Sequence, residues 1–152
     1  MKNVLFSVLT AVFMILVLMF FAKDSKPDES MYKVRRLQEK MTVFTKISPQ
    51  EKVEYYLSLL DKRFMEMQYV YDKKLDYFAV STSLRYSATA GEIVEIIKKN
   101  NLSAMIPEVR ENFENHKTGI KNILDSYPYT DEKWKFFQDA LNYLDLYLGQ
   151  LE

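Results

Sequence analysis

The chain has 152 residues, of which 48% are hydrophobic and 14% aromatic, and its 21 basic and 21 acidic residues leave a formal net charge of zero. This composition can form an apolar core, which argues against disorder, and the absence of net basicity argues against a nucleic-acid binder. With 3 glycines, 4 prolines and no cysteine, the chain is a poor fit to a many-turned β architecture and cannot form disulfides, thiolate metal sites or a cysteine nucleophile.

The first predicted element is an uncharged apolar helix over residues 4–22. At 1.5 Å per residue it rises about 28 Å, close to a hydrocarbon core of roughly 30 Å. Phe20 and Phe21 stand where a cleavage site needs small residues, which favours an uncleaved anchor. We therefore predict a membrane anchor in residues 1–22 of a single-pass membrane protein. Lys2 favours an external soluble part, whereas the basic residues after the span favour a cytoplasmic one.

A basic segment over residues 23–47 follows the predicted anchor. Residues 23–46 hold 7 basic and 4 acidic residues. Apolar positions recur there at helical spacing from Met31 through Leu37 to Phe44, so we expect a short amphipathic, membrane-proximal helix from Ser30 to about Lys46.

Residues 48–152 carry four longer helical patterns. Ser48-Pro49-Gln50-Glu51 combines an N-cap, a proline at the first helical position and the glutamate of a capping box. Asn100-Asn101 and Tyr127-Pro128 are helix stops, Pro107 begins a helix, and Thr130 with Asp131 and Glu132 caps the last one. The apolar seams run at steps of 3 and 4: Val53, Leu57, Leu60, Phe64, Met67, Tyr71; Leu75, Ala79, Thr82, Tyr86, Ala90, Ile93, Ile97; Ile106, Val109, Phe113, His116, Ile120, Ile123; Trp134, Phe137, Leu141, Leu144, Leu148, Leu151. The pattern predicts an all-α fold, with an antiparallel bundle of four long helices.

Short motifs in the first half of the chain are similar to those of a known family. They are Ser30 to Lys40, with Tyr32, Lys33 and Arg36; Ser48 to Lys52; and Lys62 to Glu66. This region, roughly residues 28–100, resembles the bacterial family called domain of unknown function 5667. The resemblance implies a secreted or membrane-anchored helical protein with an envelope-facing domain, and it places the bundle outside the cytoplasm. It implies no activity, cofactor or catalytic residue.

Candidate catalytic and metal-binding residues are sparse. His116 is the only histidine, and it lies on a predicted inner seam, so we interpret it as a core histidine. A di-iron bundle needs two Glu-x-x-His pairs, which one histidine cannot supply. The sequence has no Gly-x-Ser-x-Gly elbow and no phosphate-binding glycine loop. We therefore expect no catalytic residue, no metal, no cofactor and no enzymatic activity.

Polar residues on two of the bundle helices form further candidate sites. Arg63, Glu66 and Arg85 are candidates for an interhelical charge network that sets the register of two helices, with the small stability contribution of a surface pair. The Ser/Thr-rich stretch from Ser81 to Thr89 has two interpretations. It could line a groove for a polar ligand, or its small residues and Gly91 could admit a neighbouring helix.

Aromatic residues exceed what the seams use, and some of them belong to a candidate interaction surface: Tyr55, Tyr56, Tyr69, Tyr77, Tyr143 and Tyr147. They could equally be half-buried at bundle edges. Our leading hypothesis is a membrane-tethered, extracytoplasmic, non-enzymatic module, held by residues 4–22, that binds another envelope protein. The alternatives are a cytoplasm-facing tethered adaptor or regulator and, third, a sensor of a small polar ligand. The sequence does not indicate an oligomeric state.

Overall fold

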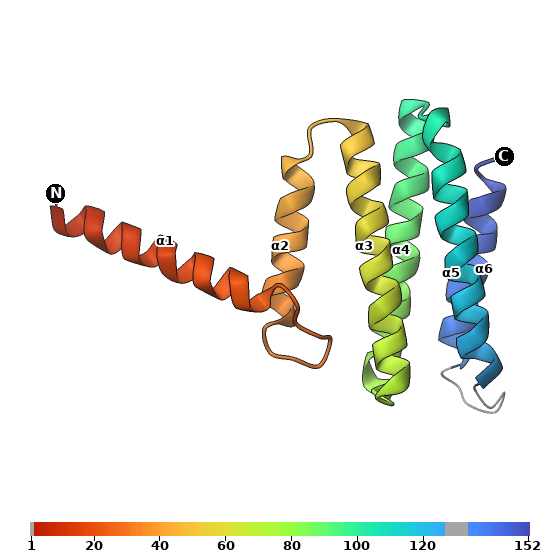
Figure 1. Cartoon of the computed structure of the whole chain (residues 1–152), viewed down its shortest axis with the longest axis horizontal. Helices are drawn as coiled ribbons and strands as arrows, with labels where there is room; N and C mark the ends of the chain where they lie inside the picture. The colour runs from red at the N-terminus through yellow and green to blue at the C-terminus, as the bar shows by residue number, and fades with distance from the viewer. Residues whose placement is uncertain (1, 127–133) are drawn as a thin grey trace. The chain divides into compact units, whose positions relative to one another are not determined.

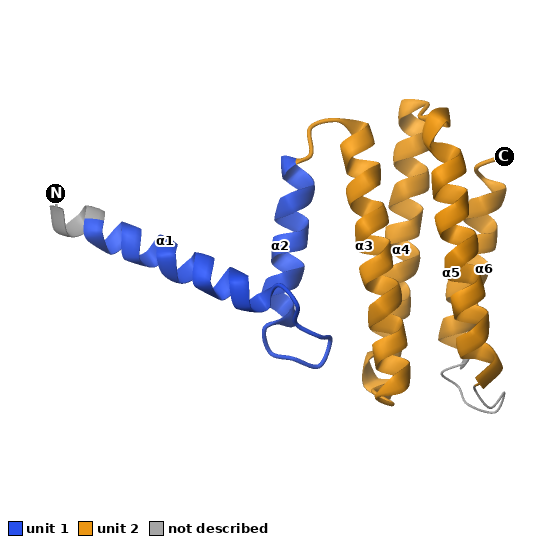
Figure 2. Ribbon diagram, viewed as in Figure 1, with its two compact units in different colours: residues 1–45 blue, residues 46–152 orange. Residues whose placement is uncertain are grey.

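The computed structural model describes residues 2–126 and 134–152, and the side chains of residues 6–126 and 135–152. These residues form six α-helices and one short 3-10 helix (Figure 1): α1 Lys2–Ala22, α2 Tyr32–Thr45, α3 Pro49–Asp72, α4 Asp76–Asn100, η1 Ser103–Met105, α5 Ile106–Ser126 and α6 Trp134–Gly149. They divide into two compact units, residues 1–45 and residues 46–152 (Figure 2). The all-helical prediction is confirmed for the described part of the chain.

The predicted membrane anchor is wrong. Among the residues that the structure describes, no helix combines the length and the apolar character needed to cross a membrane. The transmembrane helix in the predicted fold class and the single-pass membrane localisation are corrected accordingly.

Unit 1 contains α1 and α2, which contact each other. The side-chain amide of Gln38 donates a hydrogen bond to the Met19 carbonyl at 2.7 Å, and Arg35 donates to the Ser25 carbonyl at 2.6 Å. Arg35 also pairs with Glu39 at 3.2 Å, and both side chains are buried. The predicted short helix is present as α2; it buries this ion pair and exposes Leu37, Met41 and Phe44.

The ends of the bundle helices follow the local sequence signals. The Ser48 side chain accepts from the Glu51 amide at 3.1 Å, and the Glu51 carboxylate accepts from the Ser48 amide, so the predicted capping box is present. Asn101 ends α4 with φ 53°, the left-handed conformation that asparagine tolerates better than most residues. Pro107 lies in the first turn of α5, as predicted. The predicted signals at Tyr127-Pro128 and Thr130 to Glu132 lie outside the described residues.

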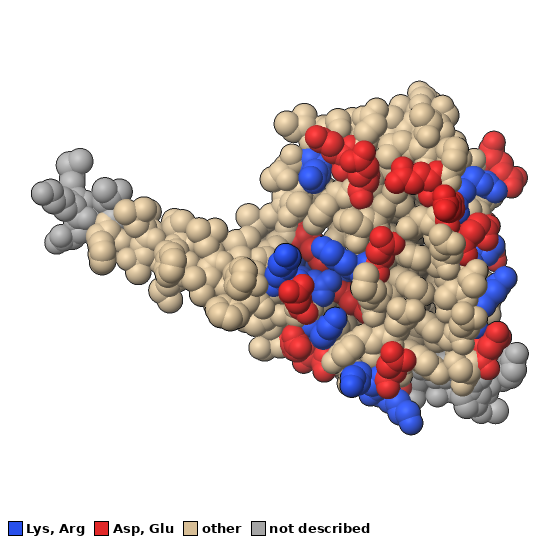
Figure 3. Space-filling view, viewed as in Figure 1, with Lys and Arg blue, Asp and Glu red and all other residues tan. Residues whose placement is uncertain are grey.

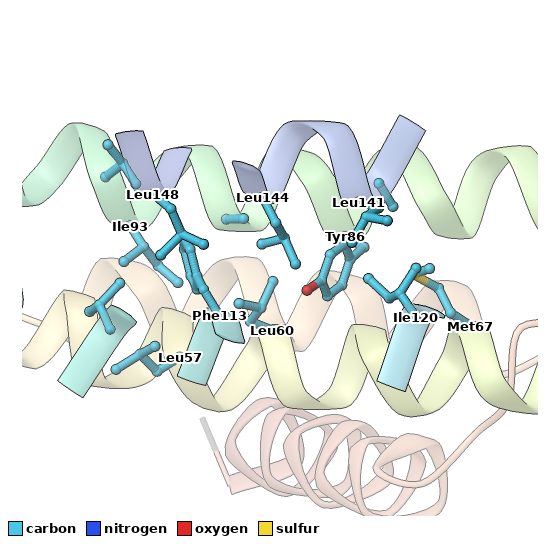
Figure 4. Close-up of a cluster of buried hydrophobic side chains, with 14 of the residues drawn as sticks. Leu57, Leu60, Met67, Tyr86, Ile93, Phe113, Ile120, Leu141, Leu144 and Leu148 are labelled. Carbon is cyan, nitrogen blue, oxygen red and sulfur yellow. The ribbon is translucent and has the colours of Figure 1, made fainter. Parts of the chain in front are cut away.

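Unit 2 is a four-helix bundle in which consecutive helices run in opposite directions (Figure 1). α3 packs on α4, α4 on α6, α6 on α5 and α5 on α3. The pairs α4/α6 and α3/α5 therefore run parallel, an arrangement that the seams alone do not specify. Seam residues from all four helices form one buried cluster, including Leu60, Tyr86, Phe113 and Leu144 (Figure 4).

Two glycines let helices of the bundle accept aromatic rings. A Cβ atom built on Gly91 of α4 lies 2.7 Å from the Tyr147 hydroxyl of α6, and one built on Gly119 of α5 lies still closer to the Phe64 ring of α3. Both distances are shorter than a van der Waals contact, so each ring occupies space that any side chain would fill. The prediction that Gly91 admits a neighbouring helix is confirmed.

Candidate functional site

A chain of hydrogen bonds crosses the interior of the bundle between α4, α5 and α3. The Tyr86 hydroxyl lies 3.1 Å from Nδ1 of His116, and Nε2 of His116 lies 3.1 Å from Oδ1 of Asp61. The Asn112 side-chain amide donates to the same Asp61 oxygen at 3.0 Å. Because a carboxylate only accepts, Nε2 of the neutral histidine carries the proton and Nδ1 accepts from Tyr86. We call Tyr86, His116 and Asp61 the relay.

Packing holds the relay histidine in place. The Phe64 ring stacks on the imidazole with 4.6 Å between ring centroids, and the space at Gly119 admits the edge of that ring. His116 is 9% exposed at its side chain, whereas Asp61 is 45% exposed, so the relay leads from the apolar core to solvent. His116 thus lies in the core, as the sequence predicted.

The electrostatics of the relay favour uncharged tyrosine and histidine. Burial lowers the pKa of His116 below its ordinary value, and the Asp61 carboxylate opposes that shift. Burial also raises the pKa of Tyr86 well above its ordinary value, with Asp61 as a smaller cause in the same direction. A high-pKa phenol and a low-pKa imidazole make a stable hydrogen-bonded pair and a poor nucleophile. Within the described residues, no group of three or more histidine and acidic side chains is placed to hold a metal ion.

Two residues of the predicted charge network form a pair on α3. Arg63 donates to Glu66 at 2.7 Å, and both residues are buried on α3. The side chain of Arg85 donates to Thr82, one turn earlier on its own helix, at 3.3 Å. The expectation of a surface pair is wrong, because the side chains of Arg63 and Glu66 are only 1% and 3% exposed. A buried pair of this kind is costly to break, since either charge left alone would be buried without its partner.

The hydroxyls of the Ser/Thr-rich stretch bond to backbone carbonyls. Ser81 and Thr82 donate to the Phe78 carbonyl, and Thr89 donates to the Arg85 carbonyl, all within α4. Ser83 donates to the Phe136 carbonyl of α6. This last bond and the contact at Gly91 fix α4 against α6, which accounts for the small residues on this side of α4.

The six candidate tyrosines separate into exposed and half-buried groups. Tyr77 is 90% exposed and Tyr143 is 42% exposed. The half-buried tyrosines are Tyr55, Tyr56, Tyr69 and Tyr147. Tyr55 lies under the Lys46 ammonium at 5.7 Å, and Tyr147 fills the space at Gly91. Tyr77 of α4 and Tyr143 of α6 are therefore the two of the six tyrosines whose side chains are most accessible to a partner.

An exposed apolar stripe continues from Tyr77 along α4. Val80 and Leu84 follow it at steps of 3 and 4 and are 38% and 60% exposed. Ala88, the next residue at this spacing, is also exposed. Tyr143 stacks on Tyr147 with 6.0 Å between centroids, and Tyr147 contacts Gly91, so Tyr143 lies beside the α4 turn that contains Ala88.

We call this surface the α4/α6 face: Tyr77, Val80, Leu84, Ala88 and Tyr143. Exposed acidic residues lie next to it along both helices: Glu92, Glu95 and Asp139. On the side of unit 2 that Figure 3 shows, acidic and basic side chains are interspersed.

The sequence pattern did not predict Val80 and Leu84 as surface contact residues, nor the two residues that bond to His116. A signal for the first two is present, because Tyr77, Val80 and Leu84 have helical spacing on the side of α4 opposite its seam. No comparable signal exists for Asp61, since its pairing with His116 depends on the register of α3 against α5.

The chain matches a known protein family. The model of a domain of unknown function (DUF5667) matches residues 24–130, which is more than half of the chain. The chain belongs to the DUF5667 family. The match covers α2 to α5 and so includes the whole relay and the stripe on α4. No curated protein and no solved structure matches the chain.

Proposed function

We propose that unit 2 is a non-enzymatic protein-binding module whose contact surface is the α4/α6 face. The observation that carries this proposal is the exposed stripe of Tyr77, Val80 and Leu84, which is continued across α6 by Tyr143. Contiguous exposed apolar side chains with aromatic anchors are typical of protein interaction sites.

The chemistry of the buried polar residues supports a binding role over an enzymatic one. The relay pairs a phenol of raised pKa with an imidazole of lowered pKa, and the Ser/Thr-rich stretch uses its hydroxyls on backbone carbonyls. Each of these groups contributes to the packing of helices. The exposed apolar residues of the α4/α6 face leave much of their surface in solvent, so an external contact is the use that they suit.

The charges around the face indicate which partner fits it. Glu92 and Glu95 extend α4 beyond the stripe, and Asp139 precedes Tyr143 by one turn. An apolar helix docked on Leu84 and Tyr143 would place its flanking residues near these carboxylates. The proposed occupant is therefore an amphipathic helix of a partner protein with basic residues beside its apolar face.

Site-specific photocrosslinking in the full chain tests this function. A photoreactive phenylalanine analogue at position 84 is compared with one at position 65, because Leu84 and Met65 are 60% and 57% exposed and lie on different helices. We expect position 84 to form an adduct whose crosslinked peptide is an amphipathic helix with basic flanks. Position 65 should not form this adduct, and Tyr77→Ala should reduce its yield.

Three outcomes of this experiment contradict the proposal. One is no adduct at position 84, and another is the same adducts at positions 84 and 65. The third is an adduct with a second copy of this chain, which would replace the proposed partner by self-association.

A further inference from the structure

His116 is the single histidine of the chain, and it connects three bundle helices. From α4 the titratable group that faces it is Tyr86, and from α3 it is Asp61. On α5 itself, Asn112 contacts Asp61. Other charged groups on α5 and α3 have their own partners: Lys117 pairs with Glu114 and with Asp145 of α6, and Arg63 of α3 pairs with Glu66.

Protonation of His116 changes its hydrogen bonding. The neutral ring accepts from Tyr86 through Nδ1 and donates to Asp61 through Nε2, whereas the imidazolium has two donors and no acceptor. The Tyr86 hydroxyl would then have to accept a hydrogen bond and direct its own hydrogen elsewhere. Tyr86 is fully buried in the same apolar cluster as Leu60, Ile120 and Leu144, whose side chains offer no acceptor (Figure 4).

We propose that the relay is a pH-sensitive switch, in which protonation of His116 breaks its bond to Tyr86 and loosens α5 from α3 and α4. The Phe64 ring, which stacks on His116 and fills the space at Gly119, is the link between the imidazole and the α3/α5 contact. When the imidazolium turns toward solvent and Asp61, this ring loses its stacking partner, and the seam around Ile120 opens.

The direction of the pH dependence follows from burial. The pKa of His116 in the folded bundle lies below the ordinary value, because burial outweighs the attraction of Asp61. The loosened state, with a solvated imidazole, therefore binds the proton more readily. The closed state is favoured above the ordinary histidine pKa of about 6.5 and loses stability as the pH falls below it.

Hydrogen exchange of the full chain at pH 7.5 and pH 5.5 tests the switch. Protection factors, which are corrected for the intrinsic pH dependence of exchange, are compared for α5 amides around His116. At pH 5.5, one unit below an open-state pKa of about 6.5, protection should fall by up to about tenfold. His116→Gln, which cannot titrate, should abolish this fall.

Two further variants, followed by NMR of the single histidine, keep the test decisive if His116→Gln fails to fold. Asp61→Asn removes the carboxylate that favours the imidazolium, so the histidine pKa in the folded bundle should fall and the loss of protection at pH 5.5 should be at least as large as in the parent. Tyr86→Phe removes the hydroxyl that would have no acceptor once His116 is protonated, so the loss of protection at low pH should be smaller than in the parent. Equal loss in the parent and His116→Gln overturns the proposal, as does an unchanged histidine pKa in Asp61→Asn.

Discussion

At the scale of single residues, the bundle interior is specific because polar groups and aromatic rings occupy matched positions. His116 satisfies both ring nitrogens, with Tyr86 on one side and Asp61 on the other. A seam histidine without such partners would leave a buried polar atom unsatisfied, which costs about 1–3 kcal/mol.

Gly119→Ala should destabilise unit 2. The added methyl group would overlap the Phe64 ring, and that ring cannot move without leaving His116. Overpacking of this kind lowers the free energy of unfolding by about 1–3 kcal/mol. Chemical denaturation followed by circular dichroism measures this difference. Gly149→Ala is the matched control, because nothing lies within 4 Å of its Cβ position, and it should be neutral or slightly stabilising. Equal effects of the two substitutions would show that Gly119 is not a packing site.

The location of His116 could be predicted from sequence, and its partners could not. The seam from Val109 to Ile123 places residue 116 inward by periodicity alone. Its bonds to Tyr86 and Asp61 depend on the axial register of three helices, which is set by contacts between distant parts of the chain.

At the scale of helices, local sequence determines the ends and tertiary contacts determine which face is buried. The capping box at Ser48 and the stop at Asn101 are formed by residues within four positions of each other, so the sequence specifies them directly. The faces of α2 could not be assigned this way, because Arg35 and Glu39 satisfy each other and Arg35 also bonds the Ser25 carbonyl. An ion pair that is buried with its hydrogen bonds satisfied can displace an apolar stripe from the packed side.

Ser48→Ala should destabilise unit 2 by about 1 kcal/mol, the typical cost of losing an N-cap side chain. The substitution removes the acceptor for the Glu51 amide at the start of α3. Ser58→Ala, in the same helix, is the control, because its exposed hydroxyl only bonds the Tyr55 carbonyl one turn earlier. Thermal unfolding should place the Ser48 variant below the parent and the Ser58 variant at or above it. The reverse order would contradict the role assigned to the cap.

At the scale of the whole molecule, the order of helices around the bundle is the feature that the sequence pattern predicts least well. Seams with steps of 3 and 4 predict four packed helices and are equally compatible with several neighbour arrangements. The contacts that select α6 as a neighbour of α4 come from positions outside the seams, namely Ser83 with the Phe136 carbonyl and Gly91 with Tyr147.

Paired cysteines test this order, because the chain contains no native cysteine. In the variant Gly91→Cys with Tyr147→Cys, a short bismaleimide should join α4 to α6, since the two positions are in contact. In the control Gly91→Cys with Asn115→Cys, the second cysteine lies on an exposed site of α5, which does not pack beside α4. Efficient linkage in the control and none in the first pair would contradict the helix order.

The central claim is that the α4/α6 face binds a partner protein, and the affinity of the crosslinked partner for variants of the full chain tests it most directly. Leu84→Ala combined with Tyr143→Ala should weaken binding by about 30-fold or more, since losing one aromatic anchor costs roughly 2 kcal/mol. Met65→Ala, which removes an apolar side chain of similar exposure on α3, should leave the affinity unchanged. If the Leu84/Tyr143 variant stays fully helical and binds as tightly as the parent, the α4/α6 face is not the binding surface.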